Sequence, residues 1–273
     1  MKFDITHPDV RRAVEAALAE DVGAGDITTD ATVPADLQAE AHFIAREPMT
    51  VAGVELLALL FNNPVLKACS GSCLQLGGEI ACVRGPARLL LTRERVALNF
   101  LQRLSGIATL AARFVAAVEG TGVRIQDTRK TTPGLRVLEK MAAAAGGVVN
   151  HRMGLYDAVL IKNNHIRLAG GVRAAIERAR ALRQPIEVEV RTHAEIEEAM
   201  ACGASRLLLD NMTPEQAAVE ICFVDHRAEI EISGGVTLAN VRAYAEARPD
   251  FISSGAITHS ATAVDINCGI YAL

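Results

Sequence analysis

The sequence predicts an α/β fold whose second half is built on a parallel sheet, which we interpret as a (β/α) barrel. Beyond about residue 120, short runs rich in Val and Ile alternate with stretches of helical periodicity, and this pattern is typical of βαβ units. The runs lie at 123–126, 147–149, 158–161, 186–190, 206–209, 229–232 and 250–252. Seven runs favour a closed barrel one strand short of eight over an open doubly wound sheet. No Gly-x-Gly-x-x-Gly motif follows a strand, which disfavours the dinucleotide-binding form of the open sheet.

Each remaining element follows from periodicity and from the residues that punctuate it. Between the runs, apolar residues recur at helical spacing over 133–145, 170–183, 193–202, 214–222 and 236–247. The first 120 residues are mixed in character. We expect a helix over 8–20, a turn-rich acidic loop over 23–30, a strand over 38–46, a helix over 51–61, three short strands within 65–91, and a helix over 92–119 with an interruption at Gly106 left open.

Composition narrows the function classes. The chain has 273 residues, of which 50% are hydrophobic and 22% charged, enough to fill a large core. Its net charge of -4 and its lack of Trp argue against a nucleic-acid binder. No signal peptide and no apolar stretch of about 20 residues is present, so we expect a cytoplasmic protein.

The six cysteines are scattered, which is typical of reduced core thiols in such a compartment. Cys69, Cys73 and Cys82 lack a nearby His that would complete a metal-binding pattern, so we discount a metal site there.

Polar residues lie at the carboxyl end of each predicted strand or just after it. Because the carboxyl ends of parallel barrel strands face one mouth, these side chains should converge there. They are Arg129, Lys130, His151, Arg152, Lys162, Glu189 and Asp210. Glu187, on the same side of its strand as Glu189, either faces this mouth or pairs with a core cation.

Such a basic pocket in an acidic protein suits a polyanionic ligand. Arg binds planar carboxylates in a bidentate manner, Lys acts as a point charge on phosphate, and carboxylates hold Mg²⁺ or sugar hydroxyls. The last two strands end in Ser233-Gly234-Gly235 and Ser253-Ser254-Gly255, where backbone N–H groups can approach a phosphate. The pattern predicts a phosphorylated sugar together with an anionic partner.

Several ordered motifs resemble the quinolinate phosphoribosyltransferase family of NAD biosynthesis, and the resemblance covers nearly the whole chain. The most specific segment is DTRKTTPGLR, from Asp127 to Arg136. It is accompanied by GDITT from Gly25, ERVALN from Glu94, LSGIAT from Leu104, NHRxGL from Asn150, IKxNH from Ile161, EVEV from Glu187, LDN from Leu209 and GAITHS from Gly255.

The resemblance implies an N-terminal open α/β sandwich over 1–108 joined by a C-terminal tail over 265–273, and an incomplete seven-stranded barrel over 109–264. It also implies a homodimer in which Arg95 reaches the neighbouring subunit's site. The substrates would be quinolinate and phosphoribosyl pyrophosphate, with Mg²⁺.

The resemblance further implies a role for each candidate site residue. Quinolinate would be bound by Arg95, Arg129, Lys130, His151, Arg152 and Lys162. Phosphoribosyl pyrophosphate would be bound by Lys130, Lys162, Glu189, Asp210, Ser233, Gly234, Gly235, Gly255 and His259. The catalytic groups would be Lys130, Lys162, Glu189 and Asp210, with Mg²⁺ on Glu189 and Asp210, directly or through water.

One departure from the family pattern lies next to Lys162. The family usually has Asp at the following position, where this chain has Asn163, so Asn163 is given no ligand role. Three alternatives remain open: a Schiff-base aldolase that uses Lys162, a non-catalytic paralogue, and a phosphoribosyltransferase that acts on nicotinate itself.

Overall fold

The computed structural model describes residues 1–273 and divides the chain into two compact units, which are described separately. Unit 1 comprises residues 1–112, 130–147 and 257–273, and unit 2 comprises residues 113–129 and 148–256. The domain boundaries expected from the sequence, 1–108 and 109–264, stay a prediction. No helix combines the length and the apolar character that a membrane crossing requires.

Unit 1 combines an antiparallel sheet with several helices. The sheet has the order β12-β1-β5-β3, and a separate two-stranded pair joins β2 and β4. Its strands are β1 (Gln38–Ala45), β2 (Met49–Thr50), β3 (Val65–Leu66), β4 (Cys73–Leu74), β5 (Glu79–Pro86) and β12 (Ile266–Ala272). Its helical elements are α1 (Pro8–Val22), α2 (Ile27–Thr32), η1 (Val54–Leu56), α3 (Leu57–Leu60), most of α4 (Ala87–Ala117), α5 (Arg136–Ala145) and most of α11 (Ala256–His259).

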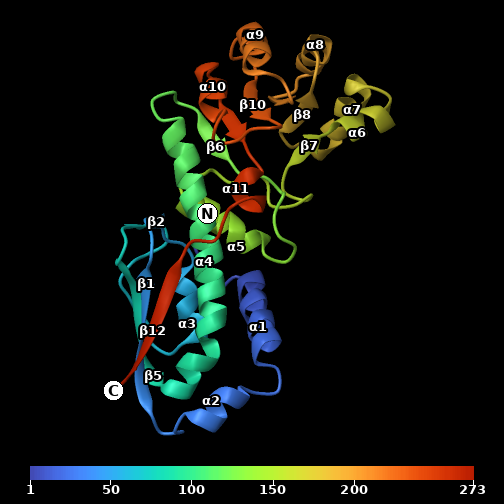
Figure 1. Ribbon diagram of the computed structural model, residues 1–273. Helices are drawn as coiled ribbons and strands as arrows, with labels where there is room; N and C mark the ends of the chain where they lie inside the picture. The colour runs from blue at the N-terminus through green and yellow to red at the C-terminus, as the bar shows by residue number, and fades with distance from the viewer. The chain divides into compact units, whose positions relative to one another are not determined.

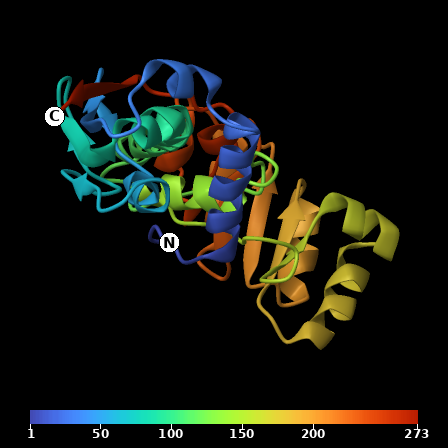
Figure 2. The same ribbon diagram turned by 90° about the horizontal axis from the view of Figure 1, so that it is seen from below.

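The sheet of unit 1 has one apolar and one polar face, because successive side chains of a strand point to opposite sides. In β1, Ala39, Ala41 and Phe43 are buried, whereas Glu40 and His42 lie on the other face and are half-buried. Helix α4 lies between this sheet and α1 in both views (Figures 1 and 2). The apolar face is therefore part of the unit 1 core.

Helix α4 is continuous through Gly106, so the interruption left open above does not occur. Glycine serves a packing purpose there, because a Cβ at Gly106 would lie 2.0 Å from the carbonyl oxygen of Thr262. Nearby, Gln102 accepts a main-chain hydrogen bond from Val264 at 3.2 Å and donates its side-chain amide to the carbonyl of Ile266 at 3.1 Å. The chain leading into β12 is thus held against α4.

Unit 2 is a parallel sheet with the strand order β6-β11-β10-β9-β8-β7. Its strands are β6 (Arg124–Gln126), β7 (Val159–Ile161), β8 (Ile186–Val190), β9 (Arg206–Asp210), β10 (Glu229–Ser233) and β11 (Phe251–Ser253). Its helices are α6 (Asn163–Ala169), α7 (Val172–Ala179), α8 (His193–Ala201), α9 (Pro214–Val224) and α10 (Val241–Glu246), with the short η2 (Arg180–Leu182). Helices α8, α9 and α10 lie together on one side of the strands of unit 2 (Figure 1). The alternation predicted from the sequence, and with it the α/β fold class, is confirmed.

Two expectations differ from the structure. The run 147–149 does not form a strand, because Val149 makes only an isolated parallel bridge with Gln126. Gly147, at φ 92°, turns the chain just before it. The expected acidic loop over 23–30 is also wrong in part, because Asp26 caps a short helix by accepting a hydrogen bond from the Thr29 N–H at 3.0 Å.

Candidate active site

The loop that carries His151 and Arg152 is fixed by a buried carboxylate at the end of β6. Asp127 is fully buried. Its Oδ1 accepts a hydrogen bond from the His151 N–H at 2.8 Å, and its Oδ2 accepts one from the Asn150 side chain at 2.6 Å. A charged acceptor with two donors is a strong anchor, so Asp127 sets the position of the two cationic residues that follow.

A buried ion cluster includes His151. It consists of His151, Glu187 and Glu231 together with Arg206. The His151 Nε2 atom is 3.3 Å from Glu187 and 3.4 Å from Glu231. Arg206 pairs with Glu187 at 2.8 Å and also with Glu231, and its guanidinium lies 4.2 Å over the ring of Phe251. Glu187, left open above, therefore pairs with cations inside the unit.

The charges of this cluster shift the pKa values of its members. Burial opposes the charge on His151, but the two carboxylates outweigh burial and raise the pKa of His151 from 6.5 to about 9. The Arg152 N–H points at His151 Nδ1 from 2.7 Å, which suits a neutral ring. The two charged contacts at Nε2 outweigh this single neutral contact. Burial raises the pKa of Glu187, whereas His151 and Arg206 hold the pKa of Glu231 below its ordinary value despite burial.

Two guanidinium groups, those of Arg129 and Arg152, lie near each other. Burial lowers the pKa of Arg152, and the positive charge of the nearby Arg129 lowers it further. The Arg152 Nη1 donates to the carbonyl of Ala158 at 3.1 Å, which directs the side chain. Two adjacent cations with fork-shaped donors form a favourable site for a compound with two carboxylates.

Two acidic residues, Glu189 on β8 and Asp210 on β9, form what we call the acid pair. Asn163 donates its side-chain amide to Glu189 and, at 3.5 Å, to Asp210. Arg191 also pairs with Asp210 at 2.7 Å, and its Nη2 atom lies 3.9 Å from Glu189. The structure therefore brings together two of the sequence-predicted acidic residues, as neighbouring parallel strands require.

The acid pair suits a magnesium ion in its chemistry. Both residues offer carboxylate oxygens, which hard cations such as Mg²⁺ prefer. The oxygens meet at the single amide group of Asn163, so they point to a common position. Glu189 and Asp210 are the residues that would hold the ion.

The loops after β10 and β11 lie side by side. Ser253 donates its hydroxyl to that of Ser233 at 2.9 Å, and the Ser254 hydroxyl donates to the carbonyl of Val236 at 2.7 Å. Gly234 has φ 98°, and a Cβ there would lie 2.4 Å from the Asn211 Oδ1 atom. Only glycine fits this close approach of two loops.

A pocket of about 570 Å³ opens beside the acid pair. It is lined by Arg191, Asp210, Asn211, Met212, Gln216 and Glu220. One carboxylate of the acid pair thus borders a cavity large enough for a small polar ligand.

The remaining cationic residues predicted from the sequence lie on exposed surfaces of the two units. Lys162 is exposed at the start of α6, where its N–H donates to the His165 side chain at 2.9 Å. Arg95, Lys130 and His259 belong to unit 1 and are exposed, and the carbonyl of Lys130 accepts a hydrogen bond from Thr258 at 2.8 Å.

Sequence reasoning missed the roles of Asp127, Arg191 and Arg206. Asp127 stands directly after a predicted strand, which is a usable signal, but its anchoring role depends on the main chain of a distant loop. Arg206 is the first residue of its strand, so it is not among the polar residues at the carboxyl ends of the strands.

Comparisons with known proteins agree over almost the full length. Residues 26–105 match the family described as quinolinate phosphoribosyl transferase, N-terminal domain, and residues 107–268 match its C-terminal domain. The chain belongs to the quinolinate phosphoribosyltransferase family. The resemblance drawn from its motifs is confirmed.

Named relatives of this family come from several organisms. The chain is 40% identical to the nicotinate-nucleotide pyrophosphorylase [carboxylating] of Mycobacterium leprae, over 97% of each chain. It is 41% identical to the chloroplastic protein of that name from Arabidopsis thaliana, over 97% of this chain and 84% of the relative. Among solved structures, the nicotinate-nucleotide pyrophosphorylase from Francisella tularensis superposes with a TM-score of 0.90 at 36% identity, over 97% of this chain and 98% of that one.

Proposed function

We propose that this protein transfers the phosphoribosyl group of phosphoribosyl pyrophosphate to quinolinate with loss of CO₂, giving nicotinate mononucleotide and pyrophosphate. The observation that carries the proposal is the proximity of the positive charges of Arg129 and Arg152, in the same unit as the acid pair. The first pair suits a dicarboxylic acid, and the second suits the hydroxyls of a sugar. Membership of the family supplies the reaction class.

In this proposal the two groups of residues bind the two substrates. Arg129 and Arg152 hold the quinolinate carboxylates, and His151 adds positive charge behind them while Asp127 fixes its loop. The acid pair holds the ribose hydroxyls, and the loops at Ser233–Gly235 and Gly255, with His259, surround a phosphate group. Bound Mg²⁺ would neutralise the pyrophosphate as it leaves.

The reaction then needs no covalent intermediate with the protein. The pyridine nitrogen, held in line, attacks C1 of the ribose while the acid pair stabilises the positive charge that develops on the sugar. Loss of the carboxylate at C2 leaves a carbanion beside the cationic ring nitrogen. Lys130 or Lys162 steers that carboxylate or supplies the proton that follows.

The proposal also includes a homodimer in which Arg95 completes the neighbouring subunit's site, and a cytoplasmic location. A mixture of an Arg95→Ala variant with an Asp210→Asn variant tests the dimer, because subunit exchange should restore part of the lost activity. If each variant is inactive alone and the mixture shows no recovery, the shared site is wrong.

A turnover assay tests the reaction itself. The protein is incubated with phosphoribosyl pyrophosphate and Mg²⁺, and with either ring-labelled or carboxyl-labelled quinolinate. We expect one CO₂ and one mononucleotide for each pyrophosphate released, with nicotinate inert. Turnover of nicotinate would support the related phosphoribosyltransferase, and no turnover would support the non-catalytic paralogue. Trapping of Lys162, which is exposed, by borohydride with a carbonyl substrate would support the aldolase.

A further inference from the structure

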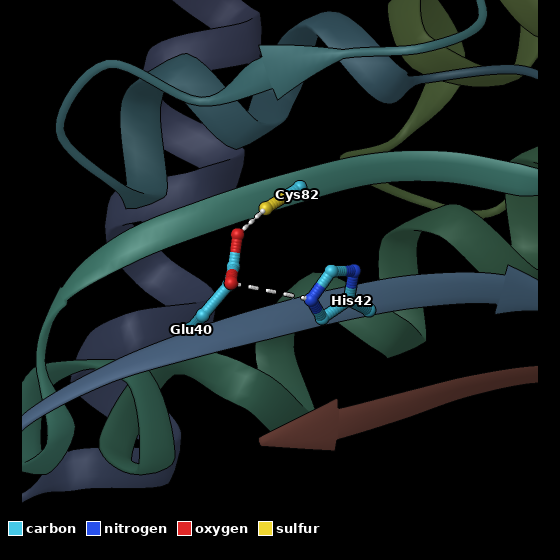
Figure 3. A group of neighbouring side chains, drawn as sticks. All are labelled: Glu40, His42 and Cys82. Carbon is cyan, nitrogen blue, oxygen red and sulfur yellow. Dashed lines mark hydrogen bonds and ion pairs between the residues drawn. The ribbon is translucent and has the colours of Figure 1, made fainter. Parts of the chain in front are cut away.

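A second group of chemically active side chains lies in unit 1, on the polar face of the sheet. Glu40 and His42 are two residues apart on β1, and Cys82 is the direct partner of His42 on the neighbouring β5. All three therefore point to the same side of the sheet, as Figure 3 shows. We call these residues the outer-face cluster.

The donor atoms of the outer-face cluster are close enough to share one ion. One ligand atom from each residue lies within 4.8 Å of the other two. Glu40 accepts a hydrogen bond from the Cys82 thiol at 2.8 Å, and its other oxygen lies 3.6 Å from the His42 Nε2 atom (Figure 3). Zinc bonds of about 2.0 to 2.3 Å in a tetrahedron place neighbouring ligand atoms roughly 3.5 Å apart.

A further carboxylate orients the histidine. Glu79 lies 2.7 Å from the His42 Nδ1 atom. A proton on Nδ1 directed at Glu79 leaves the lone pair on Nε2, the atom that faces Glu40. Histidines that bind metals are commonly held by such a carboxylate on the second ring nitrogen.

We propose that Glu40, His42 and Cys82 bind a borderline-soft divalent cation such as Zn²⁺, with water in the fourth position. A thiolate, an imidazole and a carboxylate form a donor set that suits zinc and disfavours magnesium. The ion would join β1 to β5. This site is independent of the proposed phosphoribosyl transfer.

Two features of the surroundings bear on the affinity. Burial and the nearby Glu40 and Glu79 raise the pKa of Cys82 to about 11, while Arg84 acts in the opposite direction. The metal-free thiol is therefore protonated, and zinc binding releases that proton to the solvent as the sulfur–metal bond forms. Arg84, which is mostly exposed, pairs with Glu40 at 2.9 Å and competes with the ion for this carboxylate.

A second group of three potential metal ligands consists of His151, Glu187 and Glu231. This group is less suited to binding a cation than the outer-face cluster. Arg206 already pairs with both of its carboxylates, so a cation there would meet a buried positive charge. The outer-face cluster has no buried cation of this kind.

The experiment titrates Zn²⁺ into the full chain after chelator treatment, with Mg²⁺ in excess, against a coloured competing chelator. We expect one tightly bound equivalent that is lost in Cys82→Ser and in His42→Ala. Glu79→Gln should weaken binding about 10- to 100-fold, because it leaves the ligands but loosens the histidine. Arg84→Gln should bind Zn²⁺ more tightly than the wild type does, because it removes the cation that competes for Glu40.

Cys73→Ser is the matched control, because Cys73 is an exposed cysteine of β4, which pairs with β2 and not with β1 or β5. The Cys73→Ser variant should still bind one tight equivalent of Zn²⁺. Co²⁺ bound to the wild-type protein should show a thiolate-to-metal charge-transfer band that is absent in Cys82→Ser. Thermal unfolding in chelator shows whether each variant is folded. The proposal is overturned if the wild type binds no tight equivalent, if folded Cys82→Ser retains it, or if Cys73→Ser loses it.

Discussion

Replacing Arg206 by Met should destabilise the protein far more than replacing any exposed arginine. Arg206 forms ion pairs with Glu187, at 2.8 Å, and with Glu231, and both carboxylates are buried. Removing one partner of a buried ion pair costs about 3–5 kcal/mol, since it leaves an uncompensated charge. Loss of the stacking over Phe251 adds about 0.5–2 kcal/mol. Methionine retains most of the aliphatic bulk, so the cost reports mainly on charge.

The assay is urea unfolding at neutral pH, followed by far-ultraviolet circular dichroism, because the chain has no Trp to report by fluorescence. Arg191→Met is the matched control. Arg191 is exposed and pairs with Asp210, so its loss should cost less than about 1 kcal/mol.

A double variant separates charge from packing. If the cost comes from an unbalanced carboxylate, adding Glu231→Gln to Arg206→Met should recover at least about 1 kcal/mol. The reasoning is refuted if Arg206→Met loses no more stability than Arg191→Met.

Three further predictions concern the candidate site. The pKa of His151 is raised from 6.5 to about 9, so its stabilising contribution is complete below pH 6.5 and is lost as the pH rises through 9. The difference in unfolding free energy between wild type and His151→Gln should therefore shrink between pH 6.5 and 9.5, and a constant difference would contradict the assigned charge. Asn163→Asp places a third carboxylate against the acid pair, so the variant should melt lower without Mg²⁺ and gain more from added Mg²⁺ than the wild type does; equal gains would argue against an ion there. Gly234→Ala forces a Cβ to 2.4 Å from a side-chain oxygen, and should weaken phosphoribosyl pyrophosphate binding by about 1–3 kcal/mol in calorimetry. Gly235→Ala, where nothing lies within 4 Å, is the control and should lose less.

The elements of unit 2 were predictable because their strands are buried on both faces and read as apolar runs. Val188, Leu207 and Ile232 are fully buried, for example. The run ending at Val149 failed because apolar content alone does not require strand pairing. Helix α2 was missed because it is only six residues long, too short for a periodic pattern.

The candidate site was predictable where residues lie at the carboxyl ends of strands, as with Glu189 and Asp210. Side-chain pairs that join distant segments were not. Arg191 and Asp210 are one example, and His42 and Cys82 are another. A sequence search for metal ligands looks for nearby spacing, whereas these two residues meet only through the antiparallel register of β1 with β5.

Because residue 106 is a glycine, α4 can lie very close to the chain segment that leads into β12. Thr262 crosses α4 at a separation that leaves no room for a methyl group, and β12 begins four positions later. Any larger residue at Gly106 would push the main chain at Thr262 away from α4. The position at which β12 begins would then change. The alignment of Ile266 with Ala45, and of every later pair along that edge, therefore depends partly on a residue of helix α4.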